Sequence, residues 1–220
     1  MRFVKIVFAG WIASLAATAV CAGEAQPHLQ HVIQNLFLEE YGTVAPPAAF
    51  VRFCTESPSE CVLRKAGNGF AESAKRLEQL DEVNRRINRA ITPMTDIEHY
   101  GIEDYWTIPK DGKGDCEDYA LLKRHILISL GWPTSSLLMT VVRIENGEGH
   151  AVLTARTKFG DLILDNRTDD LKPWYQTGYS YKMIQSSNDP QVWRDLDPDD
   201  DVLPTPIAVP QLLYDLTHLH

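Results

Sequence analysis

The apolar pattern of this chain changes from a helical period to a strand period near residue 131. Before that point, apolar residues recur every three or four positions, which predicts amphipathic helices over residues 71–91 and 115–130. After it, β-branched and apolar residues predict strands over residues 137–144, 150–157 and 162–166. An Asn-Gly pair between the first two strands is a strong hairpin signal. Helices followed by antiparallel strands predict an α+β domain, with N-terminal helices packed on the sheet.

Further segments flank this core in the sequence. Residues 29–40 have apolar side chains at helical spacing and predict one more helix. The aromatic-rich residues 174–193 are expected to complete the sheet, and the acidic run that follows predicts a solvated tail. We therefore divide the mature chain into a domain of residues 23–195 and an acidic C-terminal tail of residues 196–220.

The N-terminus has the pattern of a secretory signal peptide. Arg2 and Lys5 precede an uncharged apolar run that ends at Cys21, and small residues lead up to Ala22. This run of about 16 residues is short for a helix that must span a bilayer. We interpret residues 1–22 as a signal peptide that directs export to the periplasm. The alternatives are a membrane anchor or a lipoprotein modified at Cys21.

The cysteines divide into three groups. Cys21 leaves with the signal peptide or lies at its edge. Cys54 and Cys61 are close enough in sequence to close a small loop, and export permits a disulfide between them. Cys116 is then an odd thiol in an oxidising compartment. It is either a buried, inert side chain or a reactive one.

Length and charge exclude several classes of protein. The 220 residues suit a single domain with a core of useful size. The net charge of −9, without any cluster of Lys and Arg, argues against a nucleic-acid partner. Basic peptides and alkaline-earth cations suit such a surface better.

Cys116 lies where a helix is predicted to begin. The unpaired N–H groups at a helix N-terminus favour a thiolate over a thiol, and they can stabilise a developing oxyanion. Attack on an amide also requires a proton donor for the departing amine. His150 begins the second predicted strand, and Asp165 lies at the end of the third. If the strands pair with suitable register, both side chains point to the same face of the sheet, and Asp165 can orient the imidazole.

Three carboxylates flank Cys116 within four residues. Asp115, Glu117 and Asp118 repel one another and oppose formation of the thiolate. A hard divalent cation such as calcium, which accepts 6–8 oxygens, relieves more of this repulsion than the helix dipole does. The loop around 133–135 is a candidate source of further carbonyl ligands. The alternative is that the three acids only cap the helix.

Three short motifs carry a resemblance to a known family. They are Gly114-Asp115-Cys116-Glu117-Asp118-Tyr119-Ala120, His150-Ala151-Val152-Leu153 and Leu164-Asp165-Asn166. Together they resemble the bacterial transglutaminase-like cysteine proteinases over roughly residues 70–195. The resemblance implies a papain/transglutaminase-like core, a triad of Cys116, His150 and Asp165, and dependence on calcium.

The resemblance also suggests partners. Well-characterised members of that family clip large surface adhesins, and an inner-membrane receptor that senses cyclic di-GMP restrains them. We accordingly expect a protein substrate and a monomeric enzyme. Two other functions remain open: acyl transfer to an amine, as in transglutaminases, and a non-catalytic calcium-responsive binding module. A zinc site is disfavoured, because the chain has no CxxC pair or HExxH motif.

Overall fold

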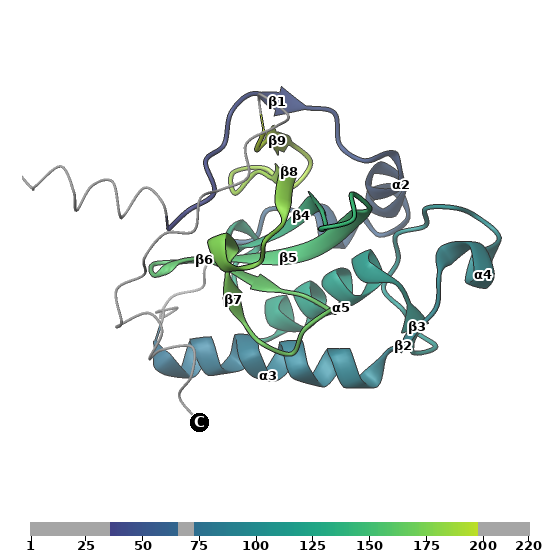
Figure 1. Ribbon diagram of the computed structural model, residues 1–220, viewed down its shortest axis with the longest axis horizontal. Helices are drawn as coiled ribbons and strands as arrows, with labels where there is room; N and C mark the ends of the chain where they lie inside the picture. The colour runs from purple at the N-terminus through teal and green to yellow at the C-terminus, as the bar shows by residue number, and fades with distance from the viewer. Residues whose placement is uncertain (1–35, 66–72, 198–220) are drawn as a thin grey trace, which may run out of the picture.

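The computed structural model describes residues 36–65 and 73–197, and in this part of the chain helices cover a seven-stranded sheet (Figure 1). The strand order is β1-β9-β8-β4-β5-β6-β7, and every pairing is antiparallel. These strands are β1 (Thr43–Val44), β4 (Leu137–Arg143), β5 (Gly149–Thr157), β6 (Gly160–Leu164), β7 (Lys172–Pro173), β8 (Ser180–Gln185) and β9 (Trp193–Asp195). The predicted α+β class is confirmed.

The described helices precede the main strands of the sheet. They are α2 (Ala48–Glu56), α3 (Ala74–Ala90), α4 (Asp96–Tyr100) and α5 (Cys116–Ser129), with 3-10 turns at Pro58–Cys61, Thr134–Ser136 and Trp174–Gln176. A short parallel pair, β2 (Thr92–Pro93) and β3 (Lys113–Gly114), joins the ends of the segment that contains α4. No described helix is both long and apolar enough to cross a membrane.

Helix α5 lies between α3 and the sheet (Figure 1). Helix α3 buries one stripe, including Leu80, Val83 and Ile87, and leaves its charged face in water, as its sequence predicts. By contrast, α5 is buried on more than one side and even encloses charged residues. It ends as predicted at Gly131, whose φ of 90° is a left-handed conformation that glycine adopts easily.

The two faces of the sheet have separate apolar clusters. Ala151 and Leu153 of β5 face α5, whereas Val152, one position away, faces a second cluster that contains Ile163 and Tyr179. The register pairs Leu153 with Leu164, so the residue after β6 lies on the same face as Val152. His150 and Asp165 therefore share one face, which is the arrangement that the sequence permitted but did not fix.

The described end of the segment predicted as a helix over residues 29–40 is not helical. Residues 36–40 are a turn followed by chain without regular secondary structure, while residues 29–35 lie outside the described part. Asp161 holds this segment: its backbone N–H donates to Leu36 O at 2.9 Å, and its carboxylate accepts from Leu38 N at 2.9 Å. Contacts with the distant strand β6 override the local helical spacing.

Two sequence predictions for the ends of the chain fall largely outside the described residues. The predicted signal peptide, residues 1–22, lies entirely outside them, as do residues 198–220 of the predicted tail. Leu196 and Asp197 are described, and both contact Lys182 of β8. The backbone N–H of Leu196 donates to the carbonyl oxygen of Lys182 at 3.0 Å, and the Lys182 ammonium lies 2.7 Å from the Asp197 carboxylate.

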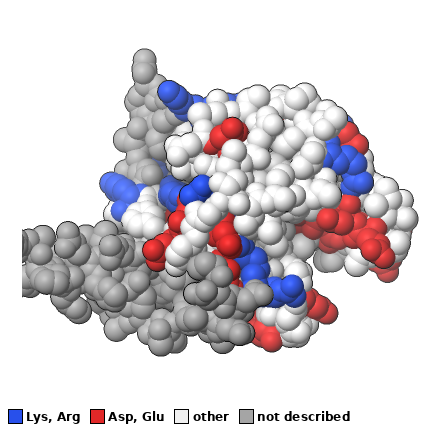
Figure 2. Space-filling view, turned by 90° about the horizontal axis from the view of Figure 1, so that it is seen from above, with Lys and Arg blue, Asp and Glu red and all other residues white. Residues whose placement is uncertain are grey.

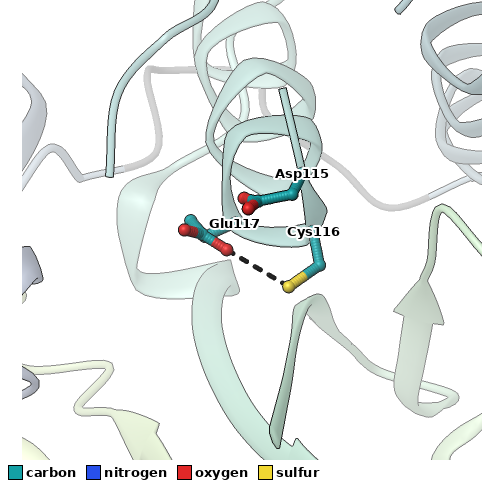
Figure 3. A group of neighbouring side chains, drawn as sticks. All are labelled: Asp115, Cys116 and Glu117. Carbon is teal, nitrogen blue, oxygen red and sulfur yellow. Dashed lines mark hydrogen bonds between the residues drawn. The ribbon is translucent and has the colours of Figure 1, made fainter. Parts of the chain in front are cut away.

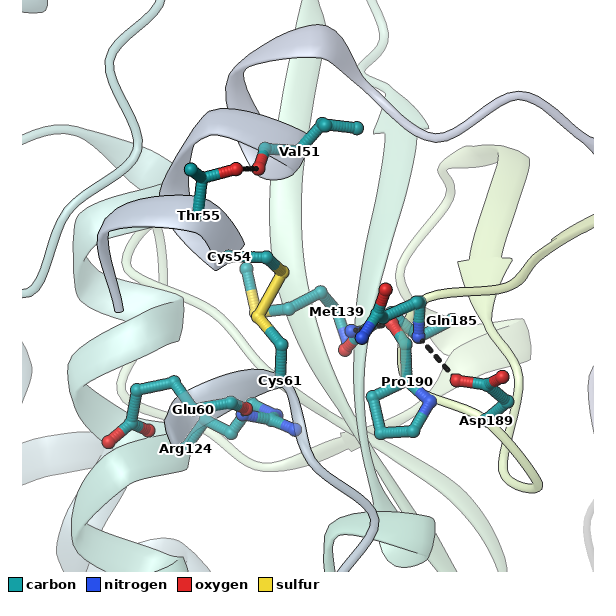
Figure 4. Close-up of a disulfide and its surroundings, with 11 residues drawn as sticks. Val51, Cys54, Thr55, Glu60, Cys61, Arg124, Met139, Gln185, Asp189 and Pro190 are labelled. Carbon is teal, nitrogen blue, oxygen red and sulfur yellow. Dashed lines mark hydrogen bonds between the residues drawn. A yellow bond between two sulfur atoms is a disulfide. The ribbon is translucent and has the colours of Figure 1, made fainter. Parts of the chain in front are cut away.

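The predicted disulfide between Cys54 and Cys61 is confirmed, with a Cα–Cα distance of 5.6 Å (Figure 4). It links the end of α2 to the turn that follows. Beside it, the buried Arg124 of α5 donates to Glu60 O at 2.7 Å and to Leu137 O at 3.0 Å. The disulfide therefore helps to hold the turn that provides one of the two carbonyl acceptors of this buried guanidinium.

We predict that removing this disulfide destabilises the fold moderately. The closed loop is short, so the Cys54→Ala/Cys61→Ala double variant should lose about 2–3 kcal/mol of unfolding free energy. Urea unfolding of both proteins measures this loss. Added reductant should lower the melting temperature of the native protein but not that of the variant, and equal sensitivity of the two proteins would contradict the prediction.

Candidate active site

Cys116 is the first residue of α5, and its thiol points toward the sheet. The Sγ atom donates to Glu117 Oε2 at 3.1 Å (Figure 3). It also accepts a hydrogen bond from the backbone N–H of Ala151 in β5. Among the described residues it is the single cysteine outside the disulfide, and it remains partly exposed. The sulfur therefore lies between the helix N-terminus and the strand that begins with Gly149 and His150.

The electrostatic surroundings of Cys116 oppose the thiolate. Burial, followed by the neighbouring carboxylates of Glu117 and Asp115, raises the pKa of the thiol. Burial and the nearby Asp115 in turn raise the pKa of Glu117 to about 10. The acids around the thiol thus counteract the helix N-terminus unless positive charge is supplied to them.

His150 and Asp165 form a buried pair. The Nε2 atom of His150 lies 2.8 Å from Asp165 Oδ1, and their side chains are 7% and 3% exposed. Burial works against ionisation of Asp165, but hydrogen bonds from His150, Tyr179 and the Arg167 backbone outweigh it and lower its pKa. A carboxylate held ionised beside an imidazole can orient the ring and stabilise its charged form.

Cys116 and His150 line the same cleft, which has a volume of about 490 Å³. Most of the remaining lining residues are apolar or glycine, and two carry carboxylates. The former are Ala45, Pro46, Pro47, Trp106, Val141, Gly149, Ala151 and Met183, and the latter are Asp104 and Glu117. The structure therefore brings together the three residues that the sequence selected for chemistry. A thiol, an imidazole and a space for an extended substrate meet at one place.

The predicted metal ligands lie within a larger group of acids. Carboxylate oxygens of Asp96, Asp115 and Asp118 approach one another within 4.8 Å, and so do those of Asp96, Asp104 and Glu117. Sequence reasoning did not select Asp96 and Asp104 as ligands, because they come from α4 and the loop after it. The acidic composition of that segment indicates carboxylates nearby, but it does not specify which of them approach the acids of α5.

Backbone donors satisfy only part of this acid group. The N–H of Thr107 donates to Asp118 Oδ1 at 3.0 Å, that of Asp96 donates to Asp115 Oδ2 at 3.2 Å, and that of Tyr105 donates to Asp96 Oδ2. The second carboxylate oxygen of each acid, which is Oδ1 in Asp96, Oδ1 in Asp115 and Oδ2 in Asp118, is buried without a partner among the described residues.

Oxygen donors of this kind suit calcium. Burial, with the negative charges of Asp115 and Asp96, raises the pKa of Asp118 to about 8. The ionised form of this carboxylate is therefore destabilised when no cation is bound. Gly114 permits their approach, because a Cβ at that position would overlap the Asp118 carboxyl group. The residues present therefore fit a hard cation.

The suggested contribution of residues 133–135 to this site is wrong. These residues follow the C-terminus of α5, whereas the acids lie at its N-terminus. A helix of 14 residues is about 21 Å long. The segment from Asp96 to Thr107 lies beside the acids instead. Figure 2 shows an acidic area on the side of the molecule where α4 lies.

Comparison with known proteins identifies the family. The chain matches the profile of the bacterial transglutaminase-like cysteine proteinases over residues 40–201. This match covers well over half of the sequence, so the protein belongs to that family of cysteine proteinases, as the sequence motifs suggested. No curated protein matches the chain significantly.

Solved structures of one protein are similar to this chain. A structure of Legionella pneumophila LapG shares 24% sequence identity with a TM-score of 0.47, over 69% of this chain and 80% of LapG. The calcium-bound form of the same protein shares 20% identity with a TM-score of 0.47, over 86% of this chain and 95% of LapG.

A buried lysine lies behind the site. Lys123 of α5 is fully buried, and its ammonium has no hydrogen-bond partner among the described residues. Burial lowers its pKa to about 7, although the charges of Asp165 and Asp169 partly oppose this shift. The charged form of Lys123 is therefore unfavourable in the folded protein, although Asp165 and Asp169 partly stabilise it.

We predict that Lys123→Met stabilises the protein in a pH-dependent way. In the unfolded chain the lysine pKa is about 10.4, above its folded value of about 7. Between these values the unfolded chain binds more protons, so wild-type stability rises with pH across this window, while the full cost is present below it. The variant should gain ~1–4 kcal/mol near pH 6 and progressively less toward pH 10.

Urea unfolding of both proteins at several pH values measures the difference. Lys110→Met, which removes an exposed lysine, should change stability little at any pH. A stabilisation by Lys123→Met that stays constant from pH 6 to pH 10 would show that the lysine is not held as described.

Proposed function

We propose that this chain is an exported, calcium-dependent cysteine endopeptidase whose catalytic triad is Cys116, His150 and Asp165. The observation that carries the proposal is that Cys116 and His150 line one cleft while Asp165 holds His150 at 2.8 Å. Membership of a cysteine proteinase family supplies the reaction class.

The proposed reaction proceeds through an acyl-enzyme. His150 uses Nε2 to contact Asp165, which leaves Nδ1 to accept the proton of the Cys116 thiol. The thiolate attacks the carbonyl carbon of the scissile amide, and N–H groups at the start of α5 stabilise the oxyanion. The imidazolium then protonates the departing amine as the C–N bond breaks. Water, deprotonated by His150, hydrolyses the thioester and restores the thiol.

We predict that each triad residue is required for cleavage. Cys116→Ala and His150→Ala should each reduce turnover at least about a thousandfold, because triad members act as a unit. Asp165→Asn should cost less, though still more than about tenfold, since the orienting hydrogen bond is weakened and not removed. Digestion of exported proteins from the source organism, followed by mass spectrometry, measures the loss and identifies the substrate.

A matched control separates catalysis from general disruption. His125→Ala removes a half-exposed histidine from the same helix as Cys116 and should leave cleavage unchanged. Cleavage by Cys116→Ala at the wild-type rate would end the peptidase proposal. Crosslinked products in place of fragments would show acyl transfer to an amine, and an intact substrate bound without turnover would indicate a binding module.

The proposed calcium ligands are Asp115, Glu117 and Asp118, with Asp96 from α4 as an additional carboxylate. Their support is the set of buried oxygens without partners and the raised pKa values of Glu117 and Asp118. Calcium bound here would supply positive charge that neutralises the acids and fixes the start of α5. In that state the same acids hold the first turn of α5 in place, and Cys116 with it.

We predict that chelation of calcium lowers stability as well as activity. A chelator should reduce the melting temperature by several degrees, and calcium should restore it better than magnesium, which demands a smaller and more regular set of ligands. Glu117→Ala should abolish the calcium-dependent rise. Glu148→Gln, which alters an exposed acid of the β4–β5 hairpin, should retain the rise. An unchanged melting temperature in chelator and in calcium would exclude the ion.

The proposed setting is the periplasm, with a protein substrate. The signal-like residues 1–22 support export, and a large surface adhesin is the proposed substrate through resemblance to the family. An inner-membrane receptor that senses cyclic di-GMP is the proposed regulator of a monomeric enzyme. Reading the N-terminus of the secreted protein tests export, because processing should leave a chain that begins near Gly23.

A further inference from the structure

The carboxylate of Asp165 is bound on both oxygens. Oδ1 lies 2.8 Å from His150 Nε2 and accepts from the Arg167 backbone N–H at 3.0 Å. Oδ2 accepts from the hydroxyl of Tyr179 at 2.6 Å. Tyr179 is 5% exposed and lies just before β8, far along the chain from the strand that leads to Asp165.

Tyr179 also contacts the other member of the pair. Its ring meets the His150 ring edge to face, with centroids 5.8 Å apart and an interplanar angle of 78°. One side chain therefore limits rotation of the Asp165 carboxylate through its hydroxyl and limits tilting of the imidazole through its ring.

The hydroxyl of Tyr179 is itself held in place. It accepts from Arg167 Nη1 at 3.2 Å, and the guanidinium lies 5.6 Å from the centre of the tyrosine ring. The same Nη1 lies 3.1 Å from Glu145 Oε2 in the β4–β5 hairpin. A chain of contacts thus runs from the surface at Glu145 through Arg167 and Tyr179 to Asp165.

We propose that Tyr179 is a positioning residue for the catalytic pair, which acts through Asp165 and is itself oriented by Arg167. The inference rests on the proposed peptidase function. A tyrosine hydroxyl on Oδ2 fixes the plane of the carboxylate so that Oδ1 faces His150. It also draws negative charge away from Oδ1, which moderates the stabilisation of the imidazolium.

Tyr181 provides a matched control two residues further along. It is buried to a similar degree, but its hydroxyl contacts Thr177 Oγ1 at 3.0 Å and Trp174 O at 3.2 Å. Tyr179→Phe and Tyr181→Phe therefore remove the same atom from similarly buried rings, and only the first removes a hydrogen bond to Asp165.

The experiment compares the pH dependence of the two variants with that of the wild type. Turnover of the cleaved exported protein is measured from pH 5 to pH 10. Tyr179→Phe should lower kcat about tenfold with little change in KM, as expected for a lost hydrogen bond to a charged group. The alkaline limb of the pH–rate profile of Tyr179→Phe should shift to higher pH, because Asp165 then stabilises the His150 imidazolium more strongly.

Other charges near Asp165 stay constant in this comparison. They are Arg167, Glu145 and, from α5, Lys123, which titrates within this pH range but does so in the wild type and in both variants alike. Tyr181→Phe should leave the pH profile of turnover unchanged. In an Asp165→Asn background, Tyr179→Phe should cost less than twofold, because its effect is transmitted by the carboxylate. A full tenfold cost in that background, or a wild-type pH profile for Tyr179→Phe, would overturn the proposal.

A second variant keeps the test decisive if Tyr179→Phe does not fold. Arg167→Gln alters a side chain that is 40% exposed and leaves the backbone donor to Asp165 in place. Arg167→Gln should also shift the alkaline limb of the pH–rate profile to higher pH. A profile that coincides with that of the wild type would count against the proposal. Failure of the triad itself is distinguishable, since it appears as cleavage by Cys116→Ala regardless of what Tyr179→Phe does.

Discussion

The packing of α5 against β5 is the constraint on which the rest of the site depends. It brings the first residue of the helix to the first residues of the strand, so that Cys116 Sγ accepts from the Ala151 N–H beside His150. A shift of the helix by one turn, about 5.4 Å, would separate the thiol from the imidazole. Disulfide, turn and sheet contacts around Arg124 hold the other parts of α5 in position.

Helix α5 concentrates buried charge to an unusual degree. Glu117 and Asp118 at its start, and Lys123 and Arg124 further along, are all nearly inaccessible to solvent. Burying such groups is unfavourable unless they are paired. Arg124 has backbone carbonyl partners, whereas Oδ2 of Asp118 has no hydrogen-bond partner among the described residues. The helix start is therefore the place where a bound cation would change stability most.

The two ends of the proposed triad are controlled from opposite faces of the sheet. Acids from α4 and α5 surround Cys116 on one side, while on the other the chain Glu145–Arg167–Tyr179 leads to Asp165 and hence to His150. Each group is assembled from segments far apart in sequence. The cleft between them is lined mostly by apolar residues.

The sequence by itself determined the local features. Apolar spacing predicted α3, α5 and the succession of the main strands along the chain, because periodicity follows from the geometry of each element. The position of Cys116 at a helix start and the pairing of Cys54 with Cys61 were readable from near neighbours. His150 and Asp165 were selected by residue type, motif and strand position, and the register then placed them on one face.

Tertiary structure alone decided the long-range contacts. It brought Asp96 and Asp104 close to the acids of α5, brought the Tyr179 hydroxyl to Asp165, and bonded the backbone of Leu36 and Leu38 to Asp161. None of these has a signature in local spacing, because each depends on how loops fold back over the sheet. The sequence thus specified which groups are available for chemistry, and packing selected which of them meet.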